Sequence, residues 1–317
     1  MQAYTLSAPG KINLYLEIIG DRPDGFHEMA MILQSIGLSD RVHLKSIGVD
    51  QIRVTCDHPL VPNDSSNLAY RAAALMADQF PEAFQRYGGV AIAIDKHIPV
   101  GAGLAGGSTN GAAVLVGLDL MWNLGLTQAD LQELGAQLGS DVPFCIAGGT
   151  AIATGRGEVL SPLPSLDCLH LVLGKYRNLS ISTPWAYKTY RQQFSHTYVS
   201  ESDGIQGRQQ RVHSGPMVAA IASRNPEEVG KLLHNDLEKV ALPAHSVIGD
   251  LKAAFAACNP LGVMMSGSGP TVFAIAQSAD HAAQIQANVR ASLPDPNLEL
   301  WVTQSTASGI HIAYPGA

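Results

Sequence analysis

The sequence is poor in charged, aromatic and cysteine residues. Of its 317 residues, 15% are charged, 6% are aromatic and four are cysteines, whereas 46% are hydrophobic. Cys56, Cys145, Cys168 and Cys258 are too widely spaced for a zinc knuckle or a disulfide framework, so we expect buried thiols. A chain of this length and composition can bury a large core and has room for two domains.

Long apolar runs and basic clusters are also missing. Apolar runs stay short of the ~18 residues that a membrane span needs, and the N-terminal MQAYTLSAPGKINLYLEI lacks the segments of a signal peptide. The formal net charge is −7, and lysine and arginine are scattered rather than gathered into the stripe that a nucleic-acid-binding protein needs. These absences predict a cytoplasmic protein whose partners include neither membrane nor nucleic acid.

Hydrophobic periodicity predicts both helices and strands. The predicted helices are Ser66–Gln79, Ser108–Leu124, Thr127–Leu138 and Pro226–Leu233, two of them with Ser or Thr placed as N-caps. The predicted strands are Ile12–Ile18, Val42–Ser46, Ile52–Cys56, Val90–Ile94, Thr150–Thr154 and Leu169–Leu173. Because strands and helices do not alternate regularly, the pattern favours an α+β fold over a doubly wound sheet.

Two segments interrupt the periodic pattern. The stretch LSPLPSL, Leu160–Leu166, contains two prolines and predicts a boundary between a domain at 1–163 and a domain at 164–317. Ser195–Gly215 is polar and lacks periodicity, which predicts a long loop or a partly disordered insertion in the second domain.

A glycine-rich stretch, PVGAGLAGGSTNGAAVL, joins a predicted strand to a predicted helix. Such turns let the backbone adopt positive φ and leave N–H groups at the positive end of a helix, where they bind phosphate. The alternative is a tight structural turn, but five glycines in this stretch, with Ser108 and Thr109 at the start of the helix, favour a phosphate cradle. The stretch lacks the lysine of a P-loop and the pattern of a dinucleotide site, so it indicates a different nucleotide-binding loop.

Three sequence blocks identify the kind of loop. PGKINLYL (Pro9–Leu16), PVGAGLAGGSTNGAA (Pro99–Ala113) and MSGSGPTVFA (Met265–Ala274) resemble, in order and at similar spacing, the three motifs of the GHMP small-molecule kinases. The resemblance implies a two-domain α+β architecture. Its active site lies in the cleft between an N-terminal ATP-binding domain and a C-terminal domain.

Three further blocks narrow the resemblance within the family. DGFHEM (Asp24–Met29), DKHIP (Asp95–Pro99) and LGSDVPF (Leu138–Phe144) are similar to members that phosphorylate the 2-hydroxyl of a cytidine-diphosphate-linked methylerythritol in non-mevalonate isoprenoid synthesis. The similarity runs almost from end to end, with Ser195–Gly215 as the main stretch outside it.

The resemblance implies that Asp141 faces the acceptor hydroxyl and that Lys11 lies beside it. An Asp of ordinary pKa, about 3.9, is a poor base for an alcohol, but a loose transition state requires only late proton acceptance. A nearby Lys11 would keep the carboxylate ionised and stabilise charge on the attacking oxygen. From the residues alone, Asp141 could be a turn residue and Lys11 a solvated one. Asn13 is implied to hydrogen-bond the substrate.

The substrate base is implied to lie between two aromatic rings. Phe26 and Tyr187 match the rings that stack on the two faces of cytosine, and His27 matches the residue at its edge. Stacking on an aromatic side chain contributes roughly 1–3 kcal/mol per base. The alternative is that these rings are core aromatics, and Trp185 or Tyr190 could take the place of Tyr187.

The resemblance also implies ATP with Mg²⁺, whose protein ligands stay unknown. Asn67 and Lys96 are implied to lie near adenine, although Asn67 could instead cap its helix. Two departures from the family pattern are Ala105, where glycine is usual, and Gly111, where alanine is usual. The other implied nucleotide-binding residues are Pro99, Gly101, Ala102, Gly103, Leu104, Gly106, Gly107, Ser108, Thr109 and Gly267.

Two other functions are compatible with the loop. Another GHMP kinase would act on homoserine, mevalonate, diphosphomevalonate or a sugar, but these substrates have no base for Phe26 and Tyr187 to stack on. A nucleotide-binding regulator without transfer activity would not need Lys11 and Asp141 together.

Overall fold

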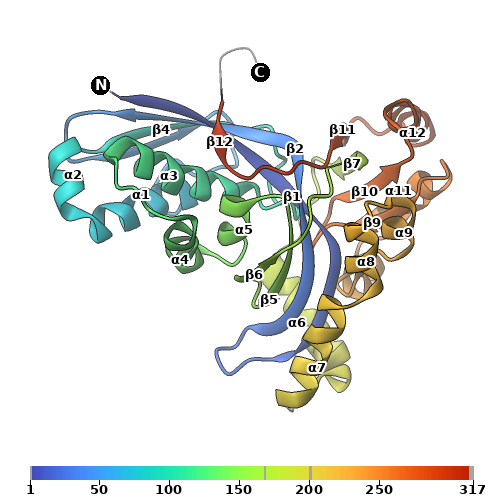
Figure 1. Ribbon diagram of the computed structural model, residues 1–317. Coiled ribbons are helices and arrows are strands. Elements are labelled where there is room, and N and C mark those ends of the chain that lie inside the picture. The colour runs from blue at the N-terminus through green and yellow to red at the C-terminus, as the bar shows by residue number, and fades with distance from the viewer. Residues whose placement is uncertain (1, 168, 200–201, 314–317) are drawn as a thin grey trace.

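The computed structural model describes residues 2–167, 169–199 and 202–313, which form two β-sheets with helices packed on them (Figure 1). The strands of the larger sheet are β1 (Ala3–Asp21), β2 (His27–Ser46), β3 (Ile52–Cys56), β4 (Val90–Asp95), β5 (Thr150–Gly155), β6 (Val159–Pro162), β8 (His234–Asn235) and β12 (His311–Ile312). Their order is β12-β1-β2-β4-β3, with β5 pairing with β2 and β6, and β8 pairing with β1. The predicted α+β fold is confirmed.

The smaller sheet is antiparallel and has the order β11-β7-β10-β9. Its strands are β7 (His170–Tyr176), β9 (Gly262–Met265), β10 (Val272–Ala276) and β11 (Leu298–Gln304). The predicted domain boundary at 163/164 falls between β6 and β7, which belong to different sheets, while β8 and β12 return to the larger sheet. The division of the chain into two domains stays a prediction.

Helices cover both sheets. They are α1 (Leu68–Gln79), α2 (Pro81–Tyr87), α3 (Gly106–Trp122), α4 (Gln128–Leu138), α5 (Val142–Ala147), α6 (Thr183–Phe194), α7 (Ser202–His213), α8 (Pro216–Ala222), α9 (Pro226–Lys231), α10 (Glu238–Ala244), α11 (Ser246–Ala256) and α12 (Ala279–Ser292), with a 3₁₀ turn at Ser195–Thr197. The helix α3 packs on β1 and β2, whereas α11 and α12 pack on the smaller sheet. Each helix and strand predicted from periodicity overlaps an observed one.

The helix α3 lies unusually close to the larger sheet. A Cβ at Gly117 would lie 2.0 Å from Leu44 Cδ1 and 2.6 Å from Leu6 Cδ1, so a larger residue would require both leucine side chains to move. Buried Ala112 and Ala113 one turn earlier extend this close contact. The packing fixes the position of the helix start, where the glycine-rich stretch ends.

Irregular pairing between β1 and β2 changes which side chains share a face. The register shifts between Pro9 and Lys11, between Asn13 and Tyr15, and again near the end of β1. Regular alternation would put Tyr15 on the same face as Asn13. The second shift instead lets Leu16 face the larger cavity described below, while Tyr15 lines a smaller one.

Two sequence predictions need correction. Much of Ser195–Gly215 is not a loop, because α7 spans Ser202–His213. Its sequence lacks apolar periodicity, but side-chain pairs with the sheet hold it: Arg208 donates to Glu17 at 2.8 Å, and Gln209 donates to Glu28 at 2.7 Å. Tertiary contacts therefore override the weak local pattern.

The cysteines are less uniformly buried than predicted. Cys145 is buried, and burial raises the pKa of its thiol, whereas Cys56 and Cys258 are half-buried. Cys168 lies outside the described residues. Within the described ranges, no helix has the length and apolar character that a membrane crossing requires.

Candidate active site

One cavity gathers residues from all the sequence blocks. It has a volume of about 740 Å³ and lies where β1, β2 and the start of α3 meet α5, α6 and the turn at 266–268. The predicted site residues that line it are Lys11, Asn13, Phe26, His27, Asn67, Lys96, Pro99, Gly101, Ala102, Gly103, Leu104, Ala105, Gly106, Gly107, Ser108, Asp141, Tyr187 and Gly267. Thr109 is not among the lining residues, because it lies in the first turn of α3 and is fully buried in the protein interior.

The glycine loop between β4 and α3 has a backbone that few residues adopt. The φ angle is positive at Gly101 (62°), Gly103 (76°) and Ala105 (58°). A Cβ at Gly103 would lie 2.3 Å from the carbonyl oxygen of Ser266, so glycine is required there. Ala105 is the N-cap residue of α3 and makes no side-chain hydrogen bond to the helix. The first N–H groups of α3 can therefore bind a ligand, and the helix dipole favours an anion.

Three polar side chains meet deeper in the cavity. Lys11 and Asn13 point to the same side of β1, and Lys11 Nζ donates to Asn13 Oδ1 at 2.8 Å. Asp141 precedes α5 without capping it, and its Oδ2 lies 3.9 Å from Lys11 Nζ. The Lys11 side chain is 6% exposed and that of Asp141 is 33% exposed. A buried cation thus accompanies a carboxylate that can accept a hydrogen bond from a ligand.

A buried ion pair holds the segment that precedes the glycine loop. Lys96 Nζ contacts Asp40 Oδ2, and the two side chains are 4% and 0% exposed. Asp40 also accepts the backbone N–H groups of His97 and Ile98 and the side-chain amide of Asn110, at 2.7 to 2.8 Å. Asp40 therefore ties the segment before the loop to the first turns of α3. Sequence reasoning missed Asp40, because its partner Lys96 is 56 residues away.

Aromatic side chains line another part of the cavity. Phe26 lies in the turn between β1 and β2 and is 50% exposed. The His27 ring lies 5.3 Å from the Tyr187 ring of α6, with an angle of 33° between the planes. Of the three aromatic residues considered on α6, Tyr187 lines the cavity, whereas Tyr190 is buried against Phe194 and Trp185 is not a lining residue.

His27 presents an unsatisfied ring nitrogen. Its Nε2 atom is buried without a hydrogen-bond partner among the described residues, and Asp21 Oδ1 lies 3.6 Å away. Burial lowers the pKa of His27 below its ordinary value, the charge of Arg191 lowers it further, and Asp21 opposes the shift. The ring is therefore neutral near pH 7. Buried polar atoms are rarely left without partners, so this nitrogen is a candidate contact for a ligand.

Asn67 has the structural role that the sequence left open. It is the N-cap residue of α1, where Oδ1 accepts the N–H of Ala69 at 2.9 Å and Nδ2 donates to the carbonyl oxygen of Pro62 at 2.7 Å. Its side chain also lines the cavity. The cap fixes the start of α1 beside the glycine loop.

Several lining residues escaped sequence reasoning, because four of them lie outside the six blocks, and nothing singled out Asn110 and Ser268 within theirs. Among them are Met31, Asn110, Arg156, Lys188, Arg191 and Ser268. A basic residue in a polar segment gives no signal of its partner. The folded chain was needed to bring these residues to the cavity.

The cavity offers few metal ligands of its own. Among the described residues, no group of three or more His, Cys, Asp or Glu side chains is arranged around a common point. The Asp141 carboxylate and the Ser108 hydroxyl line the cavity. Magnesium in nucleotide sites commonly takes one or two carboxylates together with phosphate oxygens, so this donor set fits an ion that arrives with a nucleotide.

Comparison with protein families gives two matches. Residues 67–149 match the model of the GHMP kinases N terminal domain, and residues 217–295 match that of the GHMP kinases C terminal region. The chain is also 65% identical over 314 residues to 4-diphosphocytidyl-2-C-methyl-D-erythritol kinase of Trichodesmium erythraeum (strain IMS101). That alignment covers 99% of this chain and 100% of the relative.

Two solved structures have a similar fold. A crystal structure of 4-(cytidine 5'-diphospho)-2C-methyl-D-erythritol kinase superposes with a TM-score of 0.74 and 29% identity, covering 96% of this chain and 100% of that one. Homoserine kinase from Cytophaga hutchinsonii superposes with a TM-score of 0.75 at 18% identity, covering 99% of this chain and 98% of that one. At that identity the second likeness shows the fold alone.

Proposed function

This chain belongs to the GHMP kinase family, within it to the 4-diphosphocytidyl-2-C-methyl-D-erythritol kinases, and we propose that it transfers the γ-phosphoryl group of ATP to the 2-hydroxyl of 4-(cytidine 5'-diphospho)-2-C-methyl-D-erythritol. The reaction is a step of the non-mevalonate (MEP) route to isoprenoid precursors. One observation carries the proposal: a single cavity joins a phosphate-binding loop, a lysine–aspartate pair and an aromatic pocket with an open imidazole nitrogen.

The proposed chemistry takes place at Asp141 and Lys11. The acceptor oxygen forms a bond to the γ-phosphorus as the bond from that phosphorus to the bridging oxygen of ADP breaks. The hydroxyl proton passes to Asp141 late in the step, because a loose transition state needs little nucleophile deprotonation. Lys11 Nζ lies 3.9 Å from Asp141 Oδ2, where its charge stabilises the negative charge that develops in the transition state.

The glycine loop provides the phosphate site. The backbone N–H groups at the start of α3, with the Ser108 hydroxyl, hold the ATP phosphates, while Gly267 closes the opposite wall. We propose Mg²⁺ as the metal, which the ATP phosphates would hold together with the Ser108 hydroxyl. When bound, it neutralises charge on the transferring phosphoryl group. Asn67 and Lys96 border the adenine side in this proposal.

Substrate choice depends on the aromatic end of the cavity. Phe26 and Tyr187 stack on the two faces of cytosine, and His27 contacts its polar edge. Asn13 hydrogen-bonds the methylerythritol part near Lys11. Homoserine, mevalonate and sugars have no base for these rings, and a regulator without transfer activity has no use for Asp141 beside Lys11. ATP is made available inside the cell, so we propose the cytoplasm as the place of the reaction.

A turnover assay with parallel acceptors tests the proposal. With Mg²⁺ and ATP, we expect ADP release with the cytidine-linked methylerythritol and none with homoserine, mevalonate or galactose. Turnover of one of the other acceptors identifies a different family activity, and no turnover with any acceptor supports a regulator.

Two variants assign the chemistry. Asp141→Asn is expected to lower kcat by about 10²–10⁴-fold and leave ATP affinity nearly unchanged, since the phosphates are held elsewhere. Lys11→Met is expected to lower kcat more than it raises either KM. Asp50→Asn, in an exposed turn before β3, is the matched control. If the Asp141 variant retains more than about a tenth of kcat, Asp141 is not the proton acceptor.

A further inference from the structure

The turn between β1 and β2 is exposed and carries one of the proposed stacking rings. It carries Phe26, which is half exposed, and it includes Gly25 with a φ angle of 86°. An exposed turn of this kind samples many conformations unless other contacts hold it. A stacking ring needs a fixed position, so the contacts that hold the turn determine how well Phe26 can bind a base.

One arginine ties the turn to α6. Arg191 Nε donates to Asp21 Oδ1 at 2.8 Å, and Arg191 Nη2 donates to the carbonyl oxygen of Gly25 at 2.9 Å. Arg191 is four residues after Tyr187, so the two side chains lie on the same face of the helix, one turn apart. Arg191, which holds the turn, and Tyr187, which provides the second aromatic ring, are thus both on α6.

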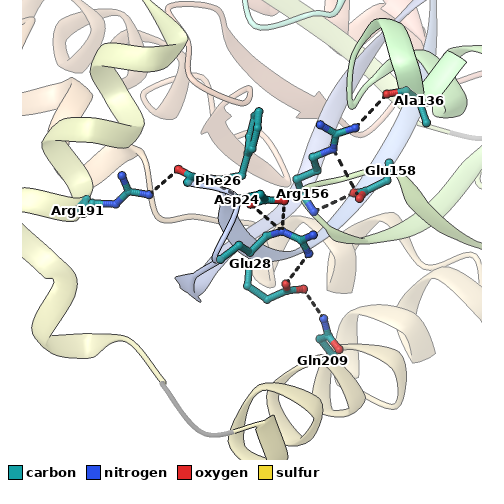
Figure 2. Close-up of polar contacts among 10 residues, drawn as sticks. Asp24, Phe26, Glu28, Ala136, Arg156, Glu158, Arg191 and Gln209 are labelled. Carbon is teal, nitrogen blue, oxygen red and sulfur yellow. Dashed lines mark hydrogen bonds and ion pairs between the residues drawn. The ribbon is translucent and has the colours of Figure 1, made fainter.

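A second arginine lies against Phe26 itself. The Arg156 guanidinium carbon is 5.2 Å from the centroid of the Phe26 ring. Figure 2 shows Arg156 beside the ring, with its contacts to Glu158 and to the α4 residue Ala136. Arg156 Nη2 donates to the Ala136 carbonyl oxygen at 3.0 Å, and its Nε lies 3.6 Å from Glu158 Oε1. The guanidinium is anchored on one face of the ring and leaves the other face for a ligand.

Hydrogen bonds also hold the residues where the turn joins the two strands. Arg22 Nη1 donates to Glu28 Oε2 at 2.9 Å, and Glu28 Oε1 accepts from Gln209 of α7 at 2.7 Å. Figure 2 shows the contact between Glu28 and Gln209 below the Phe26 ring.

Arg22 also holds the backbone of Phe26, because its N–H donates to the Phe26 carbonyl oxygen at 2.9 Å. Its Nε donates to Asp24 Oδ2 at 3.1 Å, and Asp24 Oδ1 accepts the N–H of Phe26 at 3.1 Å. These contacts lie within the turn, whereas Arg191 and Arg156 connect it to α6 and to the β5–β6 turn.

We infer that Arg191 and Arg156 are positioning residues of the nucleobase pocket: Arg191 sets the spacing between the Phe26 and Tyr187 rings, and Arg156 holds the Phe26 ring from behind. This inference rests on the proposed function. Preorganised rings bind a base without the cost of ordering the turn, and the cation over the ring adds attraction through the ring quadrupole. The reacting groups Lys11 and Asp141 lie on other elements, so the effect falls on substrate binding rather than on chemistry.

Both arginines line the cavity, so direct contact with the substrate diphosphate is the competing explanation. Two probes separate the explanations. Cytidine has no phosphate, whereas CDP carries two. A positioning role predicts the same fractional loss of affinity for both probes, because both use the base pocket. A direct charge contact predicts a loss for CDP alone.

The test uses Arg191→Gln and Arg156→Gln, with Arg177→Gln as control. Arg177 forms an exposed ion pair with Glu299 on the smaller sheet, outside the cavity. We expect cytidine and CDP to bind each cavity variant about tenfold more weakly. The KM for the cytidine substrate rises by a similar factor, while kcat and the KM for ATP stay within about twofold. The control leaves all values unchanged.

A double variant makes the test specific for Arg156. If Arg156 acts through the ring, Arg156→Gln in a Phe26→Ala background causes no further loss of cytidine affinity. Three results overturn the inference: losses of cytidine affinity that add in the double variant, a loss of affinity for CDP alone, or a fall in kcat as large as the rise in the KM for the cytidine substrate. A wild-type protein that turns over the cytidine substrate while both variants behave like the control overturns the inference and leaves the proposed function intact. A wild type that binds neither probe overturns both.

Discussion

The two ends of the cavity are built differently. At the end proposed to bind phosphate (the phosphate end), positive φ angles shape the loop, and the Asp40–Lys96 pair supports it with side chains at most 4% exposed. At the end proposed to bind the nucleobase (the base end), the ring of Phe26 is half exposed, and the ion pair that holds its turn, Arg191 with Asp21, is 38% and 47% exposed. Buried pairs are costly to break, whereas exposed pairs contribute little to stability. Changes at the phosphate end should therefore affect folding, and changes at the base end should affect substrate binding.

The largest effect is expected at Asp40. Asp40→Asn leaves the Lys96 ammonium buried without its counter-charge and directs an amide donor at it. Breaking a buried pair from one side typically costs about 3–5 kcal/mol, so we expect a loss of that size in the free energy of unfolding, measured with urea. Asp95→Asn makes the same chemical change in an exposed pair with His43 and should cost less than about 1 kcal/mol.

A double variant sharpens the test at Asp40. With Lys96→Met added to Asp40→Asn, no charge remains buried, and part of the lost stability should return. Equal stability of the Asp40 and Asp95 single variants would remove the contrast between the two ends of the cavity.

Phe26→Ala is expected to have the next largest effect. Losing one stacking face should weaken binding of the cytidine substrate by roughly 1–3 kcal/mol, or about 5- to 150-fold, and spare ATP. Because the ring is half exposed, the urea midpoint should barely change. Calorimetric titration with both ligands checks this, and Tyr187→Ala tests the opposite face. Equal losses for the two ligands would mean that Phe26 does not recognise the base.

The pH dependence of base binding should follow His27. The groups that face it are Asp21 from β1, Arg191 and Tyr187 from α6, and Tyr198 after the 3₁₀ turn. Because burial and Arg191 lower its pKa, the ring stays neutral down to about 6.5, the ordinary value, and protonates only below it. A stacked base would bury the charged ring further, so protonation opposes binding.

We therefore expect cytidine affinity to be flat from pH 8 to about 6.5 and to fall as the pH decreases further. Titration calorimetry across this range measures the profile. In His27→Gln the acid-side fall should disappear, and the remaining affinity should no longer depend on pH. A profile that already falls above pH 7, or one that persists in His27→Gln, contradicts the assignment.

The smallest effect is expected at Ala105, within the phosphate end. Its φ angle of 58° is one that glycine adopts more easily, so Ala105→Gly should relieve strain and raise the free energy of unfolding by up to about 1 kcal/mol. Ala253→Gly, at an exposed position inside α11, should instead lower it by about 1 kcal/mol. Thermal unfolding of both variants measures the difference, and a destabilised Ala105→Gly would show that the loop carries no strain there.

The contrast between the two ends also explains what could be predicted from sequence. The glycine loop is specified by residues close together in the chain, because the positive φ angles at Gly101 and Gly103 favour glycine at two positions separated by one residue. Its cavity-lining residues could therefore be named in advance. Asp40 could not, because nothing in its own segment identifies Lys96 as its partner.

At the proposed base end, the three predicted ring residues line the cavity, and their binding of a base stays a prediction. Phe26, His27 and Tyr187 could be named from resemblance, whereas Arg156 and Arg191 act through contacts with distant elements. The helix α7 was wrongly predicted as a loop, because Arg208 and Gln209 stabilise it through the sheet rather than through apolar periodicity. The shift between Asn13 and Tyr15 is likewise a property of pairing with β2, which local alternation does not encode.

The pairing of β1 has a consequence for synthesis of the protein. On the side away from β2, β1 pairs with β8 at Tyr15 and Leu16 and with β12 at Leu6 and Ser7. These partners are residues 234–235 and 311–312, so parts of that edge stay open until almost the whole chain has left the ribosome. An open strand edge can pair with a neighbouring nascent chain. The two residues of β12 thus cover part of a strand edge that could otherwise pair with another chain.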